Sequence, residues 1–316
     1  MNVNSGAIFR GDLLTYVEEA ARADELPIGT QVFPVYGVDL QQGQYPKFRI
    51  ATGELLNDES TLRSPGGTYS RVARKYEKDT YSCVDRGIEE LVDDEQKRNI
   101  SRFFSSEVIA AKLCLRSMTI AHERRVAAAL YDSSTFTATN AIVAYTNANL
   151  ATIDFVGDVL SAIDRLIQKG VVANTVVMSQ QVYTRIRRST ILQNYLRGNR
   201  PSDSQQMIRK EDVAAAFGLS QCLVGRMPYN AGKKGQAASL SQIWPNTYVW
   251  VGAVEGGDPF AGGAGRTFVW NAEGGIFVTE SYRDEQRRSD VVRVRHNTAE
   301  KVIDSTSGEL ITTNWA

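Results

Sequence analysis

The sequence predicts an α+β fold made of extended pieces joined to one more compact unit. Three observations predict it: a long polar hairpin, an uninterrupted helix of unusual length, and an alternating α/β stretch that gives way to strands at the end of the chain. The 316 residues are enough to bury a large core. The hairpin and the long helix, however, are extended parts that find too little burial within a single chain. We therefore expect other copies of the chain to cover them.

Composition and charge exclude several classes of protein. Lysine plus arginine and aspartate plus glutamate both number 36, so the formal net charge is zero, whereas a protein devoted to holding nucleic acid is usually strongly basic. No apolar run approaches twenty residues and the N-terminus lacks a signal pattern, so we expect no membrane partner, and synthesis in a cytoplasm. Cys83, Cys114 and Cys222 are odd in number and widely spaced, which indicates neither a disulfide framework nor a metal site.

Residues 1–35 are predicted to form an arm. The arm holds one amphipathic piece between polar flanks, too short to be a stable helix alone in water. Its apolar residues are Leu13, Leu14, Val17 and Ala20 or Ala21.

Residues 36–88 are predicted to form a long hairpin. Aromatic and β-branched residues indicate two extended segments, 36–50 and 69–84, and the stretch between them is polar and rich in turn residues around Pro65. A hairpin of this kind is marginal in water by itself, so we expect it to lie on another molecule.

Residues 89–131 are predicted to form one very long helix. Apolar residues recur at helical spacing from Glu90 to Met118, and no glycine or proline interrupts them. About forty residues at 1.5 Å each would give a helix of roughly 60 Å. Such a helix, with a single apolar stripe, is suited to be the backbone of a flat, extended subunit.

Residues 152–265 are predicted to alternate between helices and strands. The first helix has Thr152 as a candidate N-cap and Gly170 as its stop. VVANTVVMS then indicates a buried strand, QQVYTRIRRST and KEDVAAAFGL indicate helices, and QCLVGRMPY and NTYVWVGAV indicate further strands. Residues 266–316 are predicted to be mostly strands.

This order of parts resembles the Hong Kong 97-type capsid fold of tailed-bacteriophage major capsid (head) proteins. The most similar stretch is the helix that begins near Ile153 and continues into ANTVVMSQQVYTRIRRSTILQNYLRG, and the closing segment RTFVWNAEGGIFVTESYRDEQRRSDVVRVRHNTAEKVID resembles the family's ending. The resemblance gives the parts their family names: N-terminal arm (1–35), extended β-hairpin loop (36–88), spine helix with the first part of the peripheral domain (89–151), axial domain (152–265), and peripheral-domain strands with the C-terminus (266–316).

The resemblance implies a structural protein and no enzyme. It implies self-assembly through hexamers and pentamers into an icosahedral shell that encloses a phage genome, with double-stranded DNA held without sequence specificity. Scaffolding, portal and decoration proteins are the further partners it implies. The location it implies is the capsid of a virion assembled in the host cytoplasm.

Two alternatives remain open at the level of sequence. One is an encapsulin-like protein nanocompartment, which has a similar shell and encloses enzymes. The other is an α/β enzyme that uses the glycine-rich loop Gly256–Arg266, whose backbone amides could hold an anion. That loop lacks the spacing of a phosphate-binding motif, so a mobile connector is the better interpretation.

No catalytic residue, cofactor-binding residue or metal ligand is predicted. His122 begins HERRV, in which Val126 stands where the zinc motif HExxH needs its second histidine. We therefore interpret His122 as a half-buried helix residue and His296 as a strand residue. No serine lies in a GxSxG elbow, and no GxxxxGK[ST] loop is present.

One basic run is predicted to contact neighbouring subunits. TRIRRSTILQNYLRGNR contains five arginines and no acid. Contact with nucleic acid is the alternative, but aromatic side chains are sparse in the run. We favour acidic patches of neighbouring subunits as partners. The candidate residues are Arg185, Arg187, Arg188, Arg197 and Arg200 on the basic side, and Glu89, Glu90, Asp93 and Asp94 on the acidic side.

The resemblance also raises a covalent link between subunits, because some members of that family join a lysine of the extended loop to an asparagine of the peripheral domain. Lys75 or Lys78 would meet Asn297 here, with Glu300 or Asp304 taking the proton. The chemistry needs a deprotonated lysine in a dry pocket. Lysines beside acids are usually solvated, so we do not expect the link.

Overall fold

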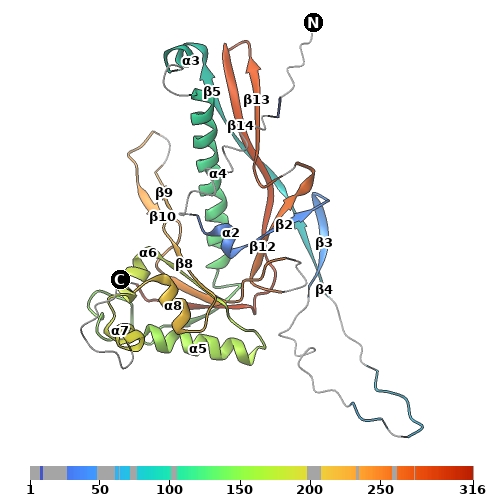
Figure 1. The fold of residues 1–316 in the computed structure, drawn as a ribbon, viewed down its shortest axis with the longest axis vertical. Helices are drawn as coiled ribbons and strands as arrows, with labels where there is room; N and C mark the ends of the chain where they lie inside the picture. The colour runs from blue at the N-terminus through green and yellow to red at the C-terminus, as the bar shows by residue number, and fades with distance from the viewer. Residues whose placement is uncertain are drawn as a thin grey trace.

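The computed structural model describes residues 8–9, 27–47, 61–63, 65–71, 77–100, 105–197, 208–232, 235–257, 262–273 and 275–315. The molecule is elongated (Figure 1). A long twisted sheet with one long helix makes up one end, and a second sheet with short helices makes up the other. The predicted amphipathic piece of the arm lies outside the described residues.

The larger sheet has six strands, and β14 is its centre. β14 pairs antiparallel with β13, β12 and β5, and β2 joins β12 in parallel at the far edge. In order along the chain the strands are β1 (Ile8–Phe9), β2 (Val35–Val38), β5 (Val84–Asp93), β12 (Gly265–Trp270), β13 (Val278–Asp284) and β14 (Ser289–Val302).

The second sheet has five strands in the order β6-β15-β11-β7-β8. Its helices pack on one face around a buried cluster that includes Phe155, Val176 and Ile186. The strands are β6 (Thr137–Asn140), β7 (Thr175–Ser179), β8 (Gln221–Gly225), β11 (Tyr248–Gly252) and β15 (Gly308–Thr312), and the helices are α5 (Phe155–Gln168), α6 (Gln180–Ile186), α7 (Thr190–Arg197) and α8 (Lys210–Ala216).

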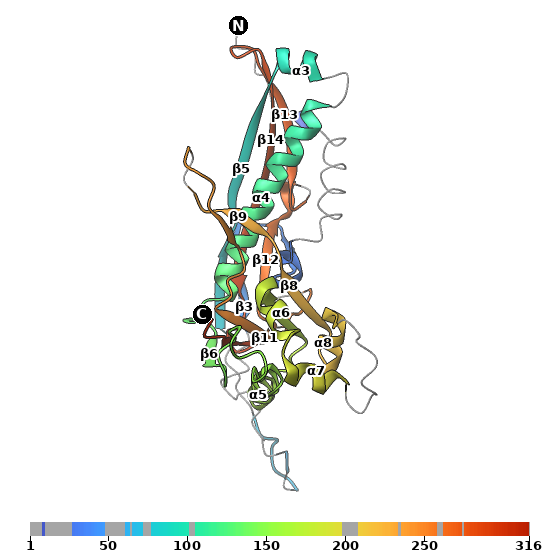
Figure 2. The same ribbon diagram turned by 90° about the vertical axis from the view of Figure 1, so that its left-hand side faces the viewer.

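Helix α4 (Ser106–Leu130) joins the two ends of the molecule. Figure 2 shows it lying along one face of the larger sheet, where Ala111 and Leu115 pack on Val92 and Val292. Its last two turns enter a second buried cluster that contains Trp244 and Trp250 of the smaller-sheet region. The short helices α2 (Gly29–Val32) and α3 (Asp94–Ile100) flank it, and η3 (Asn271–Glu273) follows β12.

Two hairpins extend from this body. β3 (Gln42–Lys47) pairs antiparallel with β4 (Glu77–Ser82), which confirms a hairpin within the predicted segment. β9 (Pro228–Asn230) pairs with β10 (Leu240–Gln242) and extends from the other side (Figure 1).

The prediction of one helix over residues 89–131 is wrong in its first part. Residues Val84–Asp93 form strand β5, α3 begins at Asp94, and the long helix α4 begins at Ser106 and has 25 residues. Ile88, Leu91 and Val92 fit helical spacing, but β5 instead forms a ten-residue ladder with β14. The pairing partner lies some two hundred residues further along the chain, so local periodicity does not contain it.

Two smaller predictions also differ from the structure. The segment beginning at Tyr36 was predicted as one hairpin strand, but β2 belongs to the larger sheet, and only β3 belongs to the hairpin. The N-cap of α5 is Asp154, whose side chain accepts from the Gly157 amide at 2.8 Å, and not Thr152. The stop of that helix is as predicted, because Gly170 has a φ of 77°.

Candidate inter-subunit surfaces

The arginine run on α6 and α7 is partly internal structure. The Arg185 guanidinium lies 3.3 Å from the centre of the Trp315 ring, and it also donates to the Tyr145 carbonyl, so burial lowers its pKa. Arg187 lies over the Tyr183 ring at 5.4 Å. Arg188 and Arg197 are exposed, and Arg200 lies outside the described residues. Two of the four described arginines therefore hold the chain's own aromatic rings, and two face solvent.

The acids proposed as their partners lie at the opposite end of the molecule, on β5 and α3 (Figure 1). Glu89 accepts from Nε of Arg293 at 2.6 Å, and Glu90 is half-buried with the Cys114 thiol 4.0 Å away. Each acid already has a partner in its own chain. An arginine from a neighbouring copy would have to compete with that partner.

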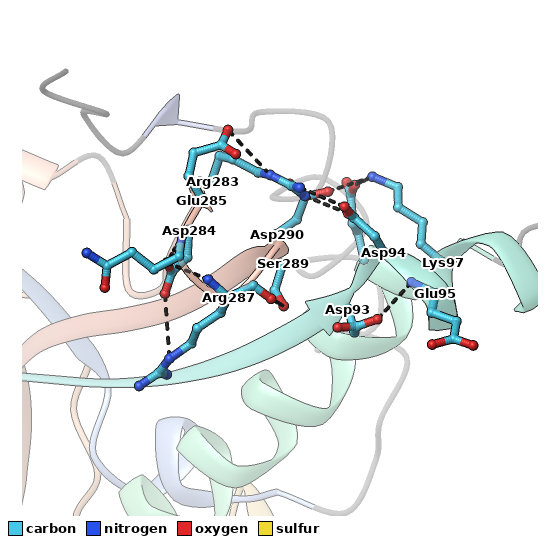
Figure 3. Close-up of polar contacts among 12 residues, drawn as sticks. Asp93, Asp94, Glu95, Lys97, Arg283, Asp284, Glu285, Arg287, Ser289 and Asp290 are labelled. Carbon is cyan, nitrogen blue, oxygen red and sulfur yellow. Dashed lines mark hydrogen bonds and ion pairs between the residues drawn. The ribbon is translucent and has the colours of Figure 1, made fainter.

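The tip of the larger sheet carries a charged network that the sequence did not indicate (Figure 3). Arg283 of β13 donates two hydrogen bonds to the Asp94 carboxylate, at 2.6 and 2.7 Å, and a third to Asp290 at 3.2 Å. Lys97 of α3 binds Asp290 at 2.8 Å and Glu107 of α4 at 2.6 Å. Hydrogen bonds from Arg283 lower the pKa of Asp94. The network ties α3, α4 and the β13–β14 turn into one rigid tip.

A second charged cluster is buried between α4 and β14. Arg125 donates to both carboxylate oxygens of Glu300, at 2.9 and 3.0 Å, and also to Nε2 of His296 at 3.1 Å. Burial lowers the pKa of His122 to about 4 and that of His296 to about 3, with Arg125 adding to both shifts. The pKa of Glu300 falls to about 2, because Arg125 and Thr298 donate to it and this outweighs burial. Both histidines are neutral near pH 7 and hold structure.

Sequence reasoning missed the role of Glu123, which is completely buried. Its carboxylate accepts from the backbone amides of Ile28 and Gly29, at 2.8 and 2.7 Å, and from Nε1 of Trp244 at 2.8 Å. It therefore holds the backbone of Ile28 and Gly29 against α4. A signal was available: an acid within the apolar stripe that continues to Val126 and Leu130 needs donors around it.

The glycine-rich loop Gly256–Arg266 surrounds its own arginine. Arg266 is fully buried, and its guanidinium donates to the carbonyl oxygens of Gly257, Gly262 and Gly265 at 3.2, 2.9 and 2.9 Å. Oxygens therefore converge in the described part of this loop, where an anion site would need amides. Residues 258–261 lie outside the described residues.

The residues named for a covalent link differ in their exposure to solvent. Lys75 lies outside the described residues, Lys78 is exposed on β4, and Asn297 is buried on β14. Within the described chain, the side-chain oxygen of Asn297 has no hydrogen-bond partner. The two acids named as proton acceptors are occupied, Glu300 by Arg125 and Asp304 by the hydroxyls of its own turn.

Among the residues that the structure describes, no three His, Cys, Asp or Glu side chains gather closely enough to hold a metal ion. In the same residues, no helix combines the length and apolar character needed to cross a bilayer.

The comparisons with known proteins identify the fold. No protein-family model matches the sequence, and the search of curated proteins finds no match. Solved structures do match: a phage-related protein from Bordetella bronchiseptica RB50 (TM-score 0.70, 20% identity, 98% of both chains) and the capsid of cyanophage P-SCSP1u (0.60, 10%, 90% of this chain and 86% of that one). A virus-like particle from Pyrococcus furiosus is also similar (0.55, 10%, 96% of both chains). The chain has the Hong Kong 97-type capsid fold that its order of parts predicted.

Proposed function

We propose that this chain is a major capsid protein that assembles through hexamers and pentamers into an icosahedral shell around a phage genome. The observation that carries the proposal is the exposure of residues 61–71, which lie between β3 and β4 in the chain. Every described residue of 61–71 is exposed, and Leu62 and Tyr69 are exposed by 90% and 70%. Within the described residues, the ring contact of Tyr69 is with Arg63 of the same segment. Large apolar side chains this far from the body gain burial only from another molecule.

The edge of the larger sheet supports the same proposal. In the described chain, β5 pairs with β14 on one side and with no strand on the other. Val84, Ile88 and Leu91 of this strand are exposed by 46%, 37% and 45%. A long edge strand with an unpaired backbone and exposed apolar side chains is a site where another chain can pair. In a shell, neighbouring subunits would cover it.

The parts of the fold suggest roles within such a shell. We assign the axial domain at the five-fold and six-fold axes to residues 152–265, and the peripheral domain to residues 89–151 and 266–316. The extended loop, residues 36–88, would lie over a neighbour. Weak contacts that repeat around a closed shell add up to a stable particle. Among the four described arginines of the run, the exposed Arg188 and Arg197 are the ones we assign to contacts between copies.

The proposal extends to partners and location. Packaged double-stranded DNA would be held without sequence specificity, and scaffolding, portal and decoration proteins would join during assembly. The assembled protein would be a component of the virion, built in the host cytoplasm. We assign it no catalytic activity.

A nanocompartment shell is the second candidate, and the comparisons do not favour it over a phage capsid. The contents of purified particles separate the two, since a capsid would hold nucleic acid and a nanocompartment a protein cargo. The third possibility, an enzyme using the Gly256–Arg266 loop, loses support because carbonyl oxygens line the described part of that loop.

Assembly of the full chain tests the proposal. Negative-stain microscopy and size-exclusion chromatography are expected to show closed particles, whereas a stable monomer of 34.9 kDa would contradict it. The double variant Leu62→Asp/Tyr69→Asp is expected to give folded subunits that no longer close into particles. Ser161→Asp, a change at an exposed position of α5 outside the surfaces proposed for contact, serves as the control, and circular dichroism checks that all variants fold.

A further inference from the structure

The β3–β4 hairpin joins the body of the molecule through two short connections. Residues 39–41 link β2 of the larger sheet to β3, and Cys83 links β4 to β5. Figure 1 shows the hairpin beginning beside β2 and β12. Neither connection contains glycine or proline, the residues that most often mark a break in regular structure. The contacts of these two connections decide whether the hairpin can swing relative to the sheet.

The carbonyl oxygens of residues 39, 40 and 41 each accept a hydrogen bond from a different group. Nε1 of Trp270, on β12, donates to the first carbonyl at 3.1 Å. The Tyr81 hydroxyl, on β4, donates to the second at 3.2 Å, and the Cys83 amide donates to the third at 2.9 Å. The Gln41 side chain donates in return to the Cys83 carbonyl at 3.3 Å, so the two connections also hold each other. A swing of the hairpin would break these bonds.

Three aromatic rings surround Phe268 of β12 at the base of the hairpin. Phe268 is fully buried, and the Tyr81 ring stacks on it with 4.8 Å between centroids and 13° between planes. The Tyr45 ring of β3 lies 5.3 Å from Phe268, and the Tyr36 ring of β2 meets it edge-on at 5.9 Å. Moving the hairpin away from β12 would separate these rings and expose them to water.

The register of the hairpin prepares it for this ring contact. Gly43 of β3 is paired with Tyr81 of β4, and a Cβ at Gly43 would lie 2.6 Å from the Tyr81 hydroxyl oxygen. The missing side chain leaves the room that the Tyr81 ring needs. Tyr45 is paired with Asp79 and donates to its carboxylate at 3.2 Å. Both tyrosines are therefore held within the hairpin as well as against the sheet.

We propose that Tyr45, Tyr81 and Phe268 form a fixed joint that sets the direction in which the hairpin leaves the larger sheet. Phe268 positions the two tyrosine rings, and the bonded carbonyls of residues 39–41 hold the connection in one conformation. The paired strands β3 and β4 then move with the sheet as one body. The joint stands whether or not the chain builds a capsid. In the proposed shell, every copy would present the base of its hairpin at the same angle.

Distances between two spin labels test the joint in the full chain. One label is attached at Lys78→Cys, an exposed position of β4, and the other at Gln286→Cys, exposed in the β13–β14 turn. The three native cysteines are buried. Labelled chains are diluted with unlabelled chains, so that only distances within one subunit are measured. The parent is expected to give one narrow distance distribution, and a broad parent distribution would overturn the proposal.

Tyr81→Leu removes the stacked ring and its hydroxyl while keeping an apolar side chain, so it is expected to broaden the distribution about twofold or more. Tyr81→Phe keeps the ring and should remain closer to the parent. Tyr282→Leu makes the same change on β13, outside the joint, and should leave the distribution unchanged. Circular dichroism checks that the variants fold. A folded Tyr81→Leu variant with the parent's narrow distribution would overturn the proposal.

The same measurement on assembled particles separates the joint from the proposed function. Because the joint is fixed, particles should give the same single distance as dispersed subunits. A second distance that arises only in particles would overturn the fixed joint. Failure of the parent to form particles would instead count against the capsid proposal, and the distribution in dispersed subunits would still decide the joint.

Discussion

The carboxylate of Glu123 accepts a hydrogen bond from the indole nitrogen of Trp244 at 2.8 Å, within the cluster that joins the two ends of the molecule. The same carboxylate holds the first turn of α2 through two backbone amides. Burial raises its pKa, while the three donors act in the opposite direction. One side chain of α4 thus links the N-terminal segment to the β8–β11 region.

Removing this carboxylate is expected to destabilise the whole joint. Glu123→Ala leaves three buried donors without an acceptor, at about 1–3 kcal/mol each, so we expect a loss of at least about 3 kcal/mol in the free energy of unfolding. Glu123→Gln keeps the shape and one acceptor oxygen and should lose less. Denaturant unfolding measures the free energy of unfolding of both variants. An alanine variant whose value lies within about 1 kcal/mol of the parent would contradict this role.

Acid is expected to weaken the fold through His122 and His296. Their pKa values in the folded chain are about 4 and about 3, below the unfolded value of roughly 6.5, so the unfolded chain binds more protons as the pH falls. The contribution of the two neutral histidines is therefore complete above about pH 6.5 and is lost as the pH falls through about 4 and about 3. With both sites contributing, the slope approaches about 2.7 kcal/mol per pH unit.

The histidine prediction has its own control. Unfolding free energies at pH 7 and pH 5 are compared for the parent and for His122→Gln/His296→Gln, which cannot take up these protons. The double variant should depend less on pH over this interval. Equal pH dependence in the two proteins would show that the histidines do not cause the effect.

Arg266 is expected to be irreplaceable by lysine. A guanidinium reaches three carbonyl oxygens in different directions, whereas an ammonium group on a flexible stem cannot reproduce this fork. Arg266→Lys should cost about 2 kcal/mol or more, since at least one buried carbonyl loses its donor. The exposed Arg197→Lys is the matched control. Thermal unfolding that does not distinguish the two substitutions would refute the prediction.

Gly225 is expected to tolerate no side chain. A Cβ placed there would lie 2.2 Å from ring carbons of Trp244, which is fully buried. Gly225→Ala should therefore destabilise the fold by about 1–3 kcal/mol through overpacking. Gly256→Ala is the matched control, because a Cβ at that position meets nothing within 4 Å. Similar melting temperatures for the two variants would count against the close approach.

Several parts of the fold were visible in the sequence because their signals are local. The apolar stripe of α5 and its stop at Gly170 lie within one stretch, and so does the apolar run of β7, which is buried at all five positions. The order of the parts indicated the fold class, which the comparisons bear out. The surfaces proposed between copies remain predictions.

Local sequence decides which segments of this protein are amphipathic, which are continuously apolar and where helices and strands end. It can do so because these signals depend on side chains within three or four residues of one another. Only the folded chain decides that Val84–Asp93 is a strand, since its hydrogen bonds go to Ser289–Thr298, and that Glu123 and Arg266 are internal anchors. Apart from the Trp244 indole, their hydrogen-bond partners named here are backbone groups, which nearly all residue types carry alike. The sequence therefore does not indicate where these backbone amides and carbonyls will lie. Tertiary packing alone brings them to the buried carboxylate of Glu123 and the buried guanidinium of Arg266.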